Sequence, residues 1–158
     1  MTRARLTLIA FLLLIANLCS GQKVITNYIN RFLPVAKALS DEFGIPISII
    51  LGVSILESGS GTSHNCRQLN NYFGVTGKNM LKKRRSAYKQ YASAEESFRD
   101  FCSILSRKNY YDKLKNSMNY TKWLAAMNHS NYAGAKGVWI TRITSIIKKQ
   151  HLNQYDKL

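Results

Sequence analysis

The stretch that decides the fold is residues 45–61, with the sequence IPISIILGVSILESGSG. Pro46 suits the first position of a helix, because that position needs no backbone N–H donor, and Gly44 before it suits the end of an earlier helix. Residues 47–56 are apolar or small on every side, which predicts a helix buried at the centre of a domain. Glu57 ends this run, and the Ser/Gly sequence that follows cannot continue a helix.

Glu57 is the only acidic residue of this stretch. At helical spacing it shares a face with Val53 and Ile50, so we expect its carboxylate to face packed side chains rather than water. Burial and the negative end of the helix dipole both disfavour the ionised form, which predicts a carboxylic acid that can donate a proton near neutral pH. The alternative is a carboxylate that binds a Lys, Arg or hydroxyl partner and only caps a loop.

The length of 158 residues suits one domain with a core of its own. The first 21 residues have the pattern of a secretory signal peptide, because Arg3 and Arg5 precede an almost wholly apolar run at 6–18 and small or polar residues follow. We therefore expect a domain over residues 22–158 that is exported to the periplasm, the cell envelope or the exterior.

The composition is strongly basic, with 23 Lys and Arg against 8 Asp and Glu and a formal charge of +15. An exported basic protein should bind anionic cell-envelope polymers, and no recognised nucleic-acid motif is present, so we expect no nucleic-acid partner. No Cys/His cluster has metal-ligand spacing and the histidines lie far apart in the sequence, so we expect no metal site. We also expect no cofactor. Cys66 and Cys102 either form one disulfide or remain two buried thiols. We expect a monomer.

Helical spacing of apolar residues predicts further helices around residues 47–56. They are expected at 26–43, with Pro34 as a break or second start, and at 64–69. Another helix should begin at residue 94, after a capping box of Ser93 and Glu96. A short helix should follow residues 109–111 and end at 114, one should begin with Thr121 as its cap, and the last should span 138–149. Short strands near Phe73 and at 87–92 would pair as a hairpin with a basic tip at 82–85. The predicted fold class is mainly α: a lysozyme-like single domain with a buried central helix and a short β-hairpin.

Four segments form a recognisable set, in the order LESGSG from Leu56, NNYFGV from Asn70, YASAEESFRD from Tyr91 and NYA from Asn131. Together they resemble glycoside hydrolase family 73, exported endo-β-N-acetylglucosaminidases that include flagellar rod-cap hydrolases and bacterial autolysins. The resemblance spans about residues 28–147, and its specificity comes from the joint occurrence of the segments. It implies that the chain acts on peptidoglycan glycan strands and cleaves the β-1,4 bond after N-acetylglucosamine.

The resemblance also implies roles for single residues. Glu57 would be the general acid, Tyr132 would support catalysis beside it, and the sugar cleft would be lined by the segment Asn71, Tyr72, Phe73 and Gly74. The alternative for Tyr132 is a tyrosine of the core.

A second carboxylate is missing where the family often has one. Glycosidases usually need two carboxylates, and residues 58–94 contain neither Asp nor Glu. Either the N-acetyl group of the substrate acts as nucleophile, or Glu95, Glu96 or Asp100 orients a water molecule. Glu96 matches a recurring acidic position of the family, although its capping role already explains it. A slow or inactive enzyme is the third outcome.

Two other functions fit the same sequence. A muramidase or lytic transglycosylase on the same fold also works with one Glu. A non-catalytic cationic protein that binds the cell wall would need only the basic surface and the cleft, and the missing second carboxylate favours it. Analysis of the products released from peptidoglycan separates these three interpretations.

Overall fold

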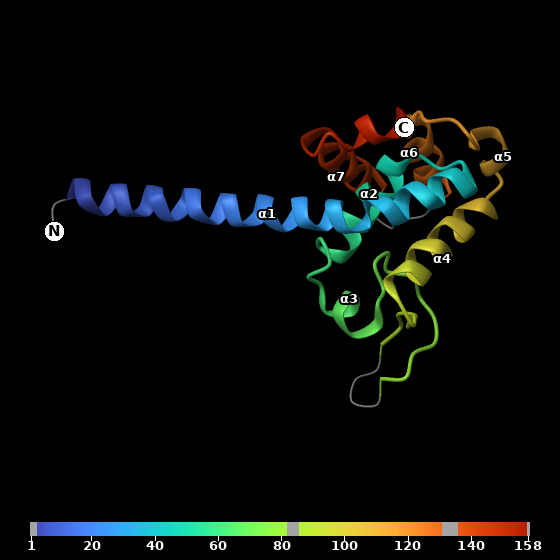
Figure 1. The fold of residues 1–158 in the computed structure, drawn as a ribbon, viewed down its shortest axis with the longest axis horizontal. Helices are drawn as coiled ribbons and strands as arrows, with labels where there is room; N and C mark the ends of the chain where they lie inside the picture. Colours follow the sequence, from blue (N-terminus) through green and yellow to red (C-terminus); the bar gives the residue numbers. More distant parts are fainter. Residues whose placement is uncertain (1–2, 82–85, 131–135, 158) are drawn as a thin grey trace.

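The computed structural model describes residues 3–81, 86–130 and 136–157, with side chains from residue 21 onward except that of Lys136. Figure 1 shows its elements, which are α1 (Arg3–Phe43), α2 (Ile47–Ser58), α3 (His64–Leu69), α4 (Ala94–Ser106), α5 (Tyr111–Leu114), α6 (Tyr120–His129), α7 (Lys136–Lys149) and the 3-10 helix η1 (Leu152–Lys157). The prediction of a mainly helical fold is confirmed. Where side chains are described, no helix is both long enough and apolar enough to span a membrane.

Helix α2 begins and ends at the signals in its sequence. Pro46 immediately precedes the helix, and its carbonyl oxygen accepts hydrogen bonds from the N–H groups of Ile49 and Ile50. Gly59 ends the helix in the left-handed conformation, with its N–H donating to the Ile55 carbonyl. Every residue from 47 to 55 is buried, and the helix packs against α1, α6, α7 and η1.

Helix α1 is longer than predicted and continues through Pro34, which does not break it. Its N-terminal part extends away from the other helices (Figure 1). It ends at Gly44, whose φ of +63° is a conformation that favours glycine. A Cβ at this position would lie 2.7 Å from the backbone nitrogen of Asn116, so the close approach of the two segments also requires glycine.

An aromatic cluster joins α1 and α4 to the segment between α3 and α4. Phe32 of α1 stacks on Phe98 of α4 with ring centroids 4.8 Å apart. Tyr72 packs edge-on against Phe32, and Phe73 stacks on Phe101 at 4.1 Å. These contacts fix residues 70–74 against the core of the domain.

The predicted hairpin is reduced to an irregular arm, residues 75–91. In its described part the two sides form a single antiparallel bridge, between Thr76 and Tyr88, and no strand. Side chains take over part of the hydrogen bonding: the Asn79 amide donates to the carbonyls of Ser86 and Tyr88, and the Gln90 side chain accepts from the Met80 N–H. The predicted basic tip at 82–85 lies outside the described residues.

Of the two predicted helix caps, the structure confirms the one at the start of α4 and replaces the one at the start of α6. The cap of α4 is confirmed, because Ser93 accepts from the Glu96 N–H. Glu96 reaches back as in a capping box, but it accepts from the N–H of Ala92, the residue before the cap. The cap of α6 is Asn119 rather than Thr121, because the Asn119 carboxamide accepts from the N–H groups of the first turn.

Both described cysteines are buried free thiols, so the disulfide alternative is excluded. Burial raises the pKa of both thiols.

Candidate active site

Glu57 lies in the last turn of α2, where the helix leaves the core, and its side chain is exposed. The prediction that it faces packed side chains is therefore wrong, because helical spacing does not tell where a helix emerges from the core. The Glu57 Oε1 accepts a hydrogen bond of 2.9 Å from the indole Nε1 of Trp139, a partner of a different kind from the Lys, Arg or hydroxyl group of the alternative interpretation.

Gly74 brings the predicted sugar-binding segment to this carboxylate. A Cβ at Gly74 would lie 3.8 Å from Glu57 Oε2 and 3.9 Å from Cε1 of Tyr88, so these two atoms both lie within 4 Å of one point. Gly74 has a φ of +67°, which suits a residue without a side chain. Tyr88, on the arm, is 37% exposed. A carboxylate oxygen and an exposed aromatic ring therefore flank a position that carries no side chain.

The other members of the segment point inward. Asn71 is buried, with its Nδ2 donating to the carbonyls of Val75 (2.8 Å) and Lys89 (2.7 Å) while its Oδ1 accepts from the Val75 N–H (3.1 Å). Tyr72 and Phe73 belong to the aromatic cluster and are 7% and 3% exposed. Burial raises the pKa of Tyr72 to about 12. These three side chains hold the segment in place, and Gly74 is its member beside Glu57.

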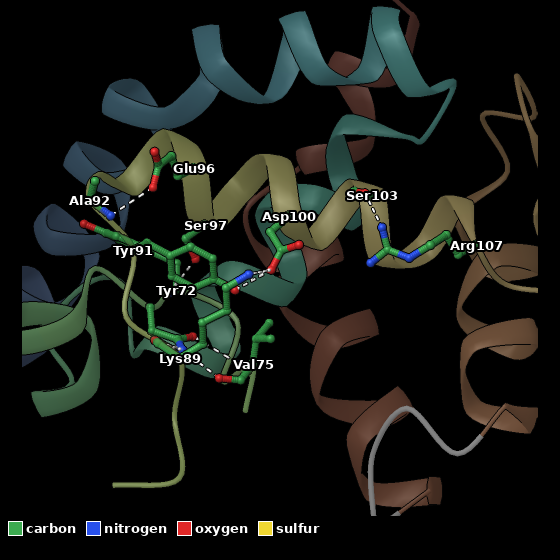
Figure 2. Close-up of polar contacts among 11 residues, drawn as sticks. Tyr72, Val75, Lys89, Tyr91, Ala92, Glu96, Ser97, Asp100, Ser103 and Arg107 are labelled. Atoms are coloured by element: carbon green, nitrogen blue, oxygen red, sulfur yellow. Dashed lines mark hydrogen bonds and ion pairs between the residues drawn. The ribbon is translucent and has the colours of Figure 1, made fainter. Parts of the chain in front are cut away.

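The carboxylates of α4 are engaged in structural contacts, as Figure 2 shows for Glu96 and Asp100. Asp100 Oδ2 accepts from the Lys89 ammonium and the Tyr91 hydroxyl, both at 2.8 Å. Partial burial would raise the pKa of Asp100, but these two hydrogen bonds and the charge of Lys89 hold it below its usual value. Glu96 is occupied by the capping box, and hydrogen bonds at the helix N-terminus lower the pKa of the exposed Glu95.

Two site residues escaped the sequence reasoning, and one predicted residue is not described. Trp139 carried a signal, because it shares a face of the last helix with Ile143 and Ile147, and a buried indole N–H needs an acceptor. Tyr88 lies in the predicted strand at 87–92, and nothing in that segment singled it out as a site residue. Tyr132 lies outside the described residues.

Residues 33–152 match the family model "Glucosaminidase: Mannosyl-glycoprotein endo-beta-N-acetylglucosaminidase". No curated protein matches the chain by sequence.

Solved structures with the same fold include the catalytic domain of the autolysin Auto from Listeria monocytogenes. It is 22% identical, with a TM-score of 0.69, and the match covers 84% of this chain and 88% of that one. The glycoside hydrolase domain of FlgJ from Salmonella typhimurium is 23% identical, with a TM-score of 0.65. This match covers 80% of this chain and 88% of that one. An N-acetylmuramoyl-L-alanine amidase from Staphylococcus aureus is 21% identical, with a TM-score of 0.70, 85% of this chain and 43% of that chain covered.

Proposed function

Because the chain belongs to the glucosaminidase family, glycoside hydrolase family 73, we propose that it is a peptidoglycan hydrolase. In this proposal it cleaves the β-1,4 bond after N-acetylglucosamine, with Glu57 as the general acid. The observation that carries the proposal is the position of the Glu57 carboxylate, exposed at the end of a buried helix with Oε2 beside Gly74 and Tyr88. The autolysin and glycoside hydrolase domains that share the fold support it.

The surroundings of Glu57 suit a sugar substrate. The missing side chain at Gly74 leaves room for a pyranose ring to approach the carboxylate. The exposed ring of Tyr88 offers an apolar face against which the C–H groups of a sugar can pack. Glu57 would then give its proton to the glycosidic oxygen as the bond to the anomeric carbon breaks.

We propose the substrate's own N-acetyl group as the nucleophile. Its carbonyl oxygen would attack the anomeric carbon while the protonated glycosidic oxygen leaves, and water would then open the cyclic intermediate with net retention of configuration. The engagement of Asp100 with Lys89 and Tyr91, and of Glu96 with the capping box, supports this route. Tyr132 remains a proposed helper of the acetamido group.

The basic composition supports binding to anionic polymers of the cell envelope, in addition to binding of the glycan strand. Loss of Arg3 and Arg5 with a signal peptide would lower the formal charge only to about +13, which still favours anionic cell-envelope polymers. We propose that the protein acts after export, as a monomer, and that this charge retains it on the wall. N-terminal sequencing of the protein recovered from cells tests the export step, and a chain that still begins at residue 1 would contradict it.

Digestion of purified sacculi tests the proposed bond specificity, with mass analysis of the newly formed ends. Reducing N-acetylglucosamine ends are expected. Anhydro-muramic ends would instead identify a lytic transglycosylase, and reducing muramic ends a muramidase. Free peptides would point to an amidase, and binding to sacculi without release of fragments would identify a non-catalytic wall-binding protein.

A further inference from the structure

The indole of Trp139 reaches Glu57 because α7 packs closely on α2. Gly52 lies at the contact, and a Cβ there would lie 3.0 Å from Cγ1 of Ile147 and 3.4 Å from Cγ2 of Ile143. Trp139 lies one and two helical turns before these isoleucines, on the same face of α7. Gly52 in the middle of α2 contacts Ile143 and Ile147, whereas Glu57 at the end of α2 contacts Trp139 near the start of α7. The two helices therefore run in opposite directions at this contact.

The hydrogen bond between Trp139 and Glu57 makes the two carboxylate oxygens of Glu57 inequivalent. An indole N–H is a donor only, so Glu57 Oε1 must be the acceptor in the 2.9 Å contact. When the carboxyl group is protonated, its carbonyl oxygen is a stronger hydrogen-bond acceptor than its hydroxyl oxygen, so the indole N–H favours Oε1 as the carbonyl oxygen. The proton is then favoured on Oε2, the oxygen that lies 3.8 Å from the point that a Cβ would occupy at Gly74.

From this geometry we infer that Trp139 is a positioning residue, which selects Oε2 of Glu57 as the proton-donating oxygen and aims it at the side of the site formed by Gly74 and Tyr88. The inference rests on the proposed function. Trp139 is 6% exposed, so its ring is held by packing. An exposed glutamate side chain otherwise rotates among several rotamers, and a fixed buried donor reduces that freedom before substrate binds.

The test compares three proteins in the full chain: wild type, Trp139→Phe, and a variant with benzothienylalanine at position 139, which replaces the indole N–H by sulfur and keeps the ring shape. Trp123→Phe is the matched control, because Trp123 is also buried and its Nε1 donates to the Ser117 carbonyl at 2.8 Å, away from Glu57. On sacculi, both position-139 variants should lose about tenfold to a hundredfold in kcat with KM within about twofold. Trp123→Phe should lose stability but keep its kcat.

A second readout does not depend on activity. With the carboxyl carbon of Glu57 followed by 13C NMR at one fixed pH, its chemical shift should change in both position-139 variants, because the carboxylate loses the indole donor that it contacts at 2.9 Å. The shift should stay unchanged in Trp123→Phe. Unchanged kcat and chemical shift in the benzothienylalanine variant would overturn the inference, as would an equal loss of kcat in Trp123→Phe. If wild type releases no fragments, the proposed function fails, and the chemical shift alone then decides the role of Trp139.

Discussion

Lys89 and Asp100 form an ion pair, with Nζ and Oδ2 2.8 Å apart, that ties the arm to α4. Tyr91 donates to the same oxygen, so one carboxylate holds two residues of the arm (Figure 2). Tyr88 directly precedes Lys89 in the chain, and the ion pair therefore helps to fix the aromatic ring that lies beside Gly74. Asp100 thus serves the site through the position of the arm.

The ion pair predicts a pH-dependent contribution to stability. Because the pKa of Asp100 is lowered in the folded state, its contribution is complete above the unfolded value of about 3.9 and is lost as the pH falls through the folded value. In urea unfolding, Asp100→Asn should be about 1 to 2 kcal/mol less stable than wild type at pH 7, and the difference should shrink below about pH 4. Asp41→Asn, at an exposed position, is the control. A difference that stays constant down to about pH 2.5 would contradict this role.

Asn71 is predicted to be a structural residue. Its carboxamide makes three hydrogen bonds that close the turn at Val75 and hold Lys89, so Asn71→Ala should lower the free energy of unfolding by about 2 to 3 kcal/mol. Asn30→Ala, at an exposed position of α1, should change it by less than about 0.5 kcal/mol. An Asn71→Ala protein with wild-type stability and weakened glycan binding would instead make Asn71 a substrate-binding residue.

Gly74→Ala should reduce activity more than stability. The left-handed φ of +67° costs an alanine about 1 to 2 kcal/mol. The added methyl group makes only ordinary contacts with Glu57 and Tyr88, but it occupies the space proposed for the sugar. We expect at least about a tenfold loss of kcat/KM on sacculi, and Gly137→Ala, with open space around the added Cβ, should show none. Full activity of Gly74→Ala would place the sugar elsewhere.

The exposed ring of Tyr88 should contribute to substrate binding. Tyr88→Ala is expected to raise KM up to about tenfold, because an aromatic contact is worth about 0.5 to 1.5 kcal/mol, while Tyr88→Phe should stay close to wild type. Met80→Ala is the matched control, since Met80 lies on the same arm and is 83% exposed. Equal effects of Tyr88→Ala and Met80→Ala would show that the arm acts without a specific ring contact.

Capping residues and helix-ending residues in the sequence predicted the positions of most helices. Gly44, Pro46 and Gly59 set the bounds of α2, and Ser93 with Glu96 set the start of α4, because caps depend on residues a few positions apart. The predicted cap of α6 lies two residues from the observed one, since Asn119 and Thr121 both suit the role. Pro34 suits either a break in α1 or a second start, and the helix instead continues through it.

The candidate site was predicted only in part. The position at the helix end and the motif resemblance both pointed to Glu57, and the resemblance pointed to residues 71–74 as a sugar-binding segment. Helical spacing does not show which residue emerges from the core, and the resemblance does not show which members of 71–74 point inward. The contact between Glu57 and Trp139 joins residues 82 positions apart. This contact depends on the packing of α7 on α2, which cannot be predicted from patterns within either helix.

The central claim is that Glu57 is the proton donor, and a comparison of wild type with Glu57→Gln on purified sacculi tests it most directly. Gln keeps the shape of the side chain and can still accept from Trp139, but it cannot donate an acidic proton. The account predicts that Glu57→Gln binds sacculi as wild type does while its rate of releasing reducing N-acetylglucosamine ends falls at least about a thousandfold. Release by Glu57→Gln within about tenfold of the wild-type rate would contradict it.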